Sequence, residues 1–156
     1  MPRFDMMHKD HERARERPAY TILAEAAVEP DLSEEDWRDL HRGAALFSQG
    51  AYWESHEAWE QGWRRCDAPS RIFFQGLIQL AAAYHQLERG VYHGVVKHFN
   101  NASAKLGQFP DRFLGVDVGS VCRCIDDGRV RVKQLGASAL GEFERHRIPT
   151  ITFGNE

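Results

Sequence analysis

The amino-acid sequence predicts an all-α fold, a compact array of about five main helices. Apolar residues recur at helical spacing in several segments, and no stretch alternates with a period of two for long enough to form a convincing strand. Glycines and prolines separate these segments. A pattern that begins at Gly50 also recurs forty residues later at Gly90, which predicts two antiparallel helical hairpins followed by a C-terminal helix.

The first predicted hairpin consists of helices over residues 33–48 and 52–65. Ser33 precedes three acidic residues, so it is a typical N-cap with negative charge in the first helical turn. Gly50 ends the first helix, and the second ends before Ala68-Pro69.

The second predicted hairpin begins at Pro69 or Ser70. Its first helix continues to Arg89 and is apolar around most of its circumference, so it should be the buried central helix. Its second helix covers residues 92–106 and stops near Gly107.

A last helical region is predicted from Asp117 to about Arg147, where Pro149 prevents further helix. Three glycines are weak points within it: Gly128, Gly136 and Gly141.

The two predicted hairpins share an internal repeat of residue types. The first copy contains Gly50, Tyr52, Ser55, Trp59 and Gly62, and the second contains Gly90, Tyr92, Val95, Phe99 and Ala102. This spacing resembles tetratricopeptide helical hairpins, and two copies favour a compact array over an extended solenoid. Chance similarity between helical hairpins is the alternative.

Length and charge limit the class of protein. The 156 residues suit one domain, and we expect an N-terminal arm over 1–30, partly mobile, before a single helical domain over 31–156. A net charge of −3 gives no electrostatic footprint for nucleic acid. No apolar run is long enough to cross a membrane, and the N-terminus lacks an apolar signal core, so we expect a cytoplasmic protein. The sequence leaves open whether the chain forms a homo-oligomer.

The segment Glu54–Glu60 combines three carboxylates and a histidine, embedded among four aromatic residues. His56 and Glu60 stand four residues apart, so their tips can converge on one ion. This arrangement predicts a divalent metal site for zinc, manganese or iron with these two residues as ligands. Glu57 would be a third ligand or a general base, and Glu54 a further catalytic candidate. A metal-bound water would then be acidified for hydrolysis.

The alternative interpretation is a structural polar network in a non-catalytic helical scaffold. Gln75 and Gln79 lie one turn apart on the central helix, and buried amides need hydrogen-bond partners. The polar edge of the second helix would supply them, with Arg64 and Arg71 as available counter-charges and Trp53 beside the cluster. A third interpretation is a module that binds a peptide or a small-molecule ligand, favoured if aromatic residues such as Trp53 are exposed.

Three blocks of this sequence resemble a known family. The block from Phe47 to Trp63 begins with a glycine turn and an aromatic residue. The motif Glu-x-His-Glu follows, and after two more residues come a glutamate, Glu60, and then Trp63. Phe74–Ala83 and Gly90–Leu106 follow it. Together they resemble domain-of-unknown-function family 309 over about residues 35–125. The resemblance implies a small helical prokaryotic protein, and that family has been labelled a predicted metal-dependent hydrolase.

Overall fold

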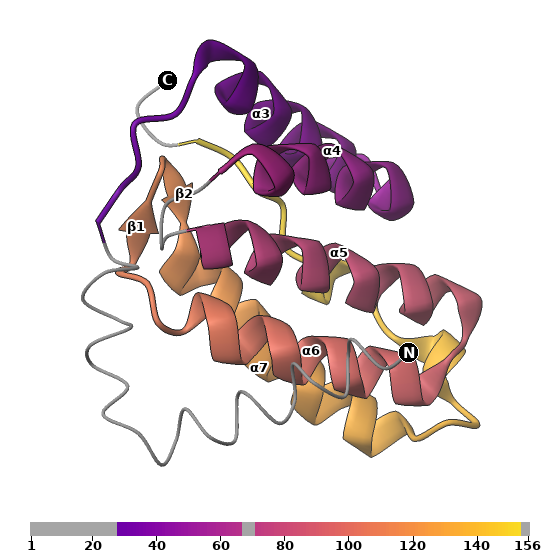
Figure 1. Ribbon diagram of the computed structural model, residues 1–156. Helices are drawn as coiled ribbons and strands as arrows, with labels where there is room; N and C mark the ends of the chain where they lie inside the picture. The colour runs from indigo at the N-terminus through magenta and orange to yellow at the C-terminus, as the bar shows by residue number, and fades with distance from the viewer. Residues whose placement is uncertain (1–27, 67–70, 154–156) are drawn as a thin grey trace.

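A computed structural model describes residues 28–66 and 71–153 of this chain (Figure 1). Over these residues the regular secondary structure is helical apart from one short β-hairpin and an isolated β-bridge, which confirms the all-α prediction. The main helices are α3 (Glu34–Ser48), α4 (Tyr52–Arg65), α5 (Ile72–Arg89), α6 (Tyr92–Leu106) and α7 (Val118–Leu135). Most of the predicted N-terminal arm, residues 1–27, lies outside the described residues.

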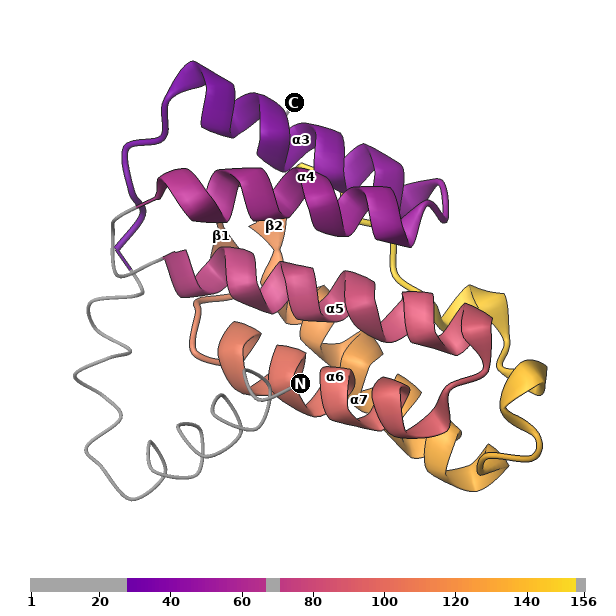
Figure 2. The same cartoon turned by 45° about the vertical axis from the view of Figure 1, so that its right-hand side comes forward.

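Helices α3 to α6 form the two predicted antiparallel hairpins, stacked in chain order, and α7 packs behind α6 (Figures 1 and 2). The Ser33 hydroxyl accepts a hydrogen bond from the backbone N–H of Asp36 at 3.1 Å, as an N-cap should. Gly50 and Gly90, which turn the chain within each hairpin, adopt φ angles of +85° and +73°. Glycine tolerates this left-handed conformation without steric cost, which is why both turns occur there.

Side-chain hydrogen bonds join α3 to α4. The Ser55 hydroxyl donates to the carbonyl of Gly43 at 2.8 Å, and the Trp59 indole donates to the carbonyl of Leu40 at 3.1 Å. A Cβ atom at Gly43 would collide with the Trp59 ring, so the glycine permits the close approach of the two helices. Arg65 extends the contact with ion pairs to Asp36 and Asp39.

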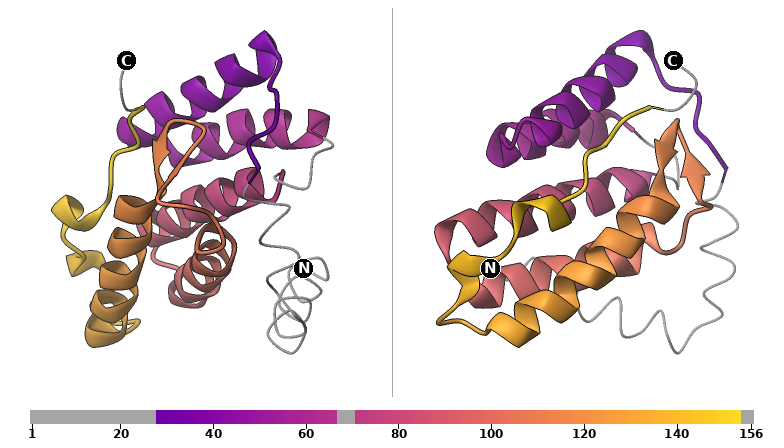
Figure 3. Two further views of the ribbon diagram at one scale, coloured as in Figure 1. Left: turned by 90° about the vertical axis from the view of Figure 1, so that its left-hand side faces the viewer. Right: turned by 180° about the vertical axis from the view of Figure 1, so that it is seen from behind.

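The hydrophobic core lies between the two hairpins, α7 and the C-terminal segment. Tyr84 of the central helix α5 is fully buried among the rings of Phe47, Tyr52 and Phe99. Seen from behind, α7 and the C-terminal segment cover the far side of α5 and α6 (Figure 3, right). The prediction of a buried central helix is therefore correct.

The region after α6 differs from the sequence prediction in two ways. Strands β1 (Arg112–Phe113) and β2 (Val116–Asp117) form an antiparallel hairpin that was not predicted. Two residues per strand are too few to show an alternating pattern. The last helix α7 ends at Leu135 and not near Arg147, because Gly136 has a φ angle of +69°. Short 3₁₀ turns follow at η2 (Leu140–Glu142) and η3 (Arg145–Arg147).

Ion pairs fasten these C-terminal turns to α7. Glu144 accepts hydrogen bonds from Arg131 at 2.8 Å and from Arg147 at 2.8 Å, and Arg147 also binds Asp127. The Arg131 hydrogen bond is the largest factor that lowers the pKa of Glu144 to about 2. No helix within the described residues is long and apolar enough to cross a membrane.

Candidate functional site

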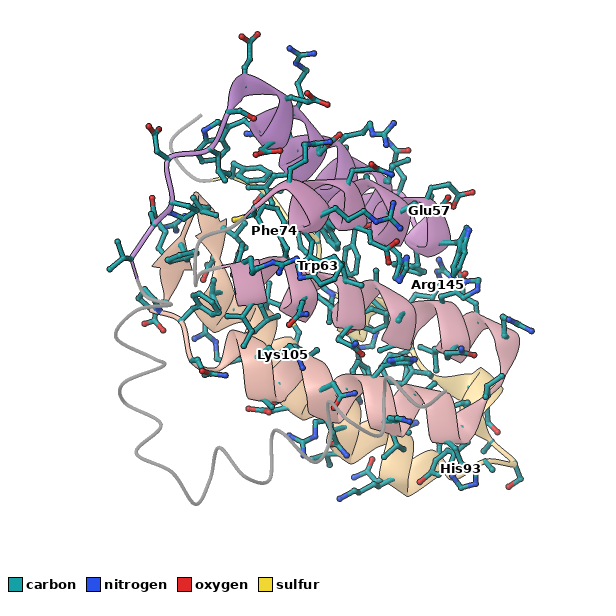
Figure 4. All side chains as sticks on the ribbon, viewed as in Figure 1. Glu57, Trp63, Phe74, His93, Lys105 and Arg145 are labelled. Atoms are coloured by element: carbon teal, nitrogen blue, oxygen red, sulfur yellow. The ribbon has the colours of Figure 1, made fainter. Side chains whose placement is uncertain are left out.

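One side of α4, α5 and α6 carries polar side chains in place of apolar ones. We call it the polar face and define it by the following residues: His56, Glu60, Trp63, Arg71, Gln79, His98 and Asn101. Gln79, His98 and Asn101 are buried, at 5%, 6% and 3% exposure. Figure 4 shows Trp63 between α4 and α5, and Lys105, one turn beyond Asn101, between α5 and α6. Polar groups therefore fill both helix–helix seams on this side.

Contacts between the helices fix which residues lie at the same level. Tyr52 packs on Tyr84, and Gly62 packs on Phe74, so the antiparallel register of α4 and α5 brings His56 close to the level of Gln79. In the same way Gly76 packs on Leu106 and Gln79 bonds His98, which sets Asn101 near the middle of α5. The polar face thus runs from His56, His98 and Asn101 near its middle to Trp63 at one end.

His56 is half-buried beside an aromatic platform. Its ring stacks on Trp53 with centroids 5.1 Å apart and planes inclined by 7°, and its Nε2 lies 3.9 Å from Glu60 Oε2. Burial lowers the pKa of His56; Glu60 and Glu57 partly oppose this, and His85 adds to it. Among the described residues its buried Nδ1 has no hydrogen-bond partner.

His98 forms the buried link between α5 and α6. Its Nδ1 lies 2.7 Å from Gln79 Oε1, and because an amide oxygen only accepts, Nδ1 carries the proton of this bond. Burial is the main factor that lowers the pKa of His98 to about 4, and Lys97 and His56 lower it further. The imidazole is therefore neutral near pH 7.

A second group of polar side chains occupies the end of the face where α4 finishes and α5 begins. The Arg71 guanidinium lies 4.4 Å from the centroid of the Trp63 ring, and its Nη2 donates to the Trp63 carbonyl at 3.2 Å. Two buried donors here have no partner among the described residues, Arg71 Nε and Trp63 Nε1, and nearer the middle of the face Asn101 Nδ2 has none either. Tyr84 also has an unpaired hydroxyl, but it lies in the core behind α5.

The structure brings together some of the residues predicted for the site. Glu60 lies between His56 and Arg64, whose Nη2 donates to Glu60 Oε1 at 2.6 Å. Trp53, half exposed, joins them by stacking. Glu54 and Glu57 are exposed, and no ion pair joins either to another described residue. Gln79 contacts His98 of α6, where α4 had been predicted to supply its partner. Gln75 is half-buried in the first turn of α5.

Three residues of the site were not predicted as such. His85, assigned to another side of the helix, lies with its ring centroid 5.3 Å from that of Trp53. His98 and Asn101 were also not assigned to the site, and Arg71 was predicted only as a counter-charge of the structural network. The internal repeat contains a signal for His98, because it precedes Phe99 as the buried Ala58 precedes Trp59. Helical spacing within one segment carries no information on which neighbour a side chain meets.

A metal ion would need more donors than the pair on α4. His56 and Glu60 are the two residues that could hold one, and His56 is close enough to His98 to lower the pKa of His98. Within residues 28–66 and 71–153, no three His, Cys, Asp or Glu side chains form a group that could hold a metal ion. The metal site at His56 and Glu60 therefore stays a prediction.

Comparison with known families matches residues 40–98 to the family described as a domain of unknown function, DUF309. The matched range runs from within α3 to His98 of α6, and it includes His56, Arg71 and Gln79. No curated protein and no solved structure matches the chain. The matched residues include the Glu-x-His-Glu block from which the resemblance to this family was predicted.

Proposed function

We propose that this protein is a ligand-binding helical module whose binding surface is the polar face. The observation that carries the proposal is the set of buried polar atoms without partners on that face: His56 Nδ1, Trp63 Nε1, Arg71 Nε and Asn101 Nδ2. Each buried, unsatisfied polar group costs about 1–3 kcal/mol, so a folded protein rarely keeps several on one side. A ligand with hydrogen-bond acceptors would satisfy the donors and offset that cost.

The rest of the face supports recognition of a polar ligand. Trp53 is 50% exposed and is held in place by stacking on His56, so it offers a rigid aromatic surface beside the polar groups. His98 and Gln79 hold each other in one orientation through their hydrogen bond. Binding sites typically combine aromatic contact area with a few fixed polar groups in this way.

The four tryptophans of the chain provide the test. Trp53 and Trp63 lie on or beside the polar face, whereas Trp37 and Trp59 lie on α3 and at its interface with α4. Indole N–H resonances can be followed by ¹H–¹⁵N NMR during titration with dipeptides and with small carboxylic acids and their amides. We expect at least one compound to move the Trp53 or Trp63 resonance while Trp59 stays in place.

A matched pair of histidine variants controls this titration. His56→Gln should weaken binding, whereas His93→Gln, at an exposed position of α6 (Figure 4), should bind like the wild type. If no compound in the set moves either face tryptophan, or if all four resonances move together, the proposal is wrong.

A metal-dependent hydrolase is the second candidate, favoured by the His56–Glu60 pair and by the neutral imidazole that the lowered pKa of His56 implies. His56 and Glu60 would hold the metal, which would supply an acidified water when bound. Metal analysis of untagged protein by mass spectrometry tests this candidate. Stoichiometric zinc, manganese or iron that is lost in His56→Gln would support it. Metal-free protein whose melting temperature is unchanged by these ions would rule it out.

A further inference from the structure

Trp53 differs from the other large aromatic residues that the structure describes because much of its ring faces solvent. It is 50% exposed, whereas Trp59 of the same helix is fully buried. The ring is nonetheless held in place, since it stacks on His56 and its centroid lies 5.3 Å from that of His85 on α5. A rigid aromatic side chain provides contact area at a low cost in conformational entropy. Trp53 is therefore suited to contact a ligand.

Unpaired negative charge lies beside this ring. Over residues 52–63, helix α4 contains three glutamates and neither lysine nor arginine. Two of them, Glu54 and Glu57, are exposed and form no ion pair with another described residue. Glu57 follows Trp53 by four residues, which places both side chains on the same face of the helix. A carboxylate is therefore available next to the exposed indole.

Two arginines in this region leave the charge of Glu57 unpaired. Arg64 binds Glu60, with 2.6 Å between Nη2 and Oε1. Arg145 lies at the same end of the molecule as Glu57 (Figure 4), but its guanidinium is next to Gly50, where an added Cβ atom would be 3.5 Å from its Nη2. No ion pair joins Arg145 to Glu57 within the described residues. The Glu57 carboxylate thus has no counter-charge from the described part of the chain.

Helix α4 already contains one contact between an indole and a cation. The ring of Trp63 lies under the guanidinium of Arg71, which is 4.4 Å from the ring centroid. Among the described residues no lysine or arginine covers Trp53 in the same way. The π face of an indole attracts cations, and arginine is the commonest of them in proteins. The exposed ring of Trp53 and the unpaired carboxylate of Glu57 therefore complement a positively charged group.

We propose that Trp53 and Glu57 form a subsite for the guanidinium of an arginine side chain in a peptide ligand. This inference rests on the proposed ligand-binding function and names the chemical class of the ligand. The guanidinium would stack on the exposed part of the indole and donate two parallel hydrogen bonds to the Glu57 carboxylate, as its planar set of donors allows. The backbone carbonyls of the peptide would supply acceptors for the unpaired donors of the polar face.

The test is an NMR titration of full-length protein with the blocked tripeptide acetyl-Gly-Arg-Gly-amide and with its citrulline counterpart, which has the same shape and no charge. The indole N–H resonance of Trp53 should move with the arginine peptide, and the citrulline peptide should bind at least about tenfold more weakly. Because the contact lies at the surface, high salt should weaken binding of the arginine peptide and leave that of the citrulline peptide nearly unchanged. Equal affinities of the two peptides, or no movement of Trp53 with the arginine peptide, would overturn the subsite.

Two variants and a matched control test the residues. Glu57→Gln keeps the shape of the side chain and removes its charge, so the arginine peptide should lose most of its advantage over the citrulline peptide. Glu142→Gln, at an exposed position of η2, should leave that advantage unchanged. Trp53→Leu keeps an apolar side chain without a π face and should also reduce the advantage. An undiminished preference for arginine in Glu57→Gln would contradict the subsite even if Trp53→Leu does not fold.

The outcomes separate this inference from the proposed function. If both peptides move the Trp53 or Trp63 resonance with equal affinity, the polar face binds peptides and the arginine subsite is wrong. If carboxylic acids or amides move Trp63 while the arginine peptide leaves Trp53 in place, the face binds ligands and the subsite is again wrong. A preference for arginine that depends on Glu57 supports the subsite whatever the remaining compounds do.

Discussion

The polar side chains on the two edges of helix α4 differ in whether they have hydrogen-bond partners. Toward α3, the Ser55 hydroxyl and the Trp59 indole donate to backbone carbonyls of the neighbouring helix. Toward α5 and α6, His56 Nδ1 and Trp63 Nε1 are buried without partners among the described residues. The edge toward α3 holds the fold together, whereas the other edge keeps unused hydrogen-bonding capacity. We therefore expect substitutions at the first edge to cost stability and those at the second to affect binding.

The largest contrast should come from removing a whole indole. Trp59→Ala should lower the free energy of unfolding by about 3–5 kcal/mol, because the fully buried ring would leave a cavity. Trp53→Ala removes the same side chain where it is half exposed, and should cost much less. Urea denaturation of the two variants measures both values. Similar losses would mean that the two edges of α4 are not distinct.

Acid should lower the stability of the protein through His98, which links α5 to α6. Its folded pKa of about 4 lies below the ordinary value of 6.5, so between these values the unfolded chain binds a proton that the folded chain does not. Stability is complete above pH 6.5 and falls toward pH 4, by about 3 kcal/mol in total. Urea denaturation of wild type and His98→Gln across this window should show a flatter pH dependence in the variant.

The exposed His93 provides the control for that pH effect. His93→Gln should retain the wild-type loss of stability between pH 6.5 and 4. The ion pairs of Glu144 act in a lower window, because its pKa is depressed from 4.5 to about 2 and its contribution is lost only as pH falls through those values. A wild-type stability that stays constant from pH 6.5 to 4 would contradict a buried, neutral His98.

Ser55 tests the α3 edge by a single hydrogen bond. Ser55→Ala would leave the Gly43 carbonyl without its buried donor and should lower the free energy of unfolding by about 1–3 kcal/mol. Ala45→Ser on the exposed side of α3 serves as a control and should be close to neutral. A Ser55→Ala protein as stable as wild type would show that this contact adds little to the α3–α4 interface.

The smallest effect is expected at Glu57. The side chain is exposed and forms no ion pair with another described residue, so Glu57→Ala should change the free energy of unfolding by less than about 0.5 kcal/mol. A loss comparable to that of Ser55→Ala would place Glu57 within the polar network after all.

The helices could be predicted from the sequence because their limits depend on local chemistry. Ser33 caps α3, and Gly50 and Gly90 supply left-handed turns, all recognisable without tertiary information. The site could be predicted only in part. His56 and Glu60 belong to one helix and their proximity follows from spacing, but His98 meets Gln79 through the register of two helices. The unpaired donors of Arg71 and Asn101 also depend on what surrounds them in space.

The most direct test of the difference between the two edges compares Trp59→Phe with Trp63→Phe. Each substitution removes one indole N–H from α4 and keeps an aromatic ring, which in the second case still lies under Arg71. Trp59→Phe should cost about 1–3 kcal/mol by urea denaturation, because the Leu40 carbonyl loses its donor. Trp63→Phe should leave the ligand-free protein as stable as wild type or more so. A loss at Trp63 equal to that at Trp59 would contradict the assignment of the polar face to binding.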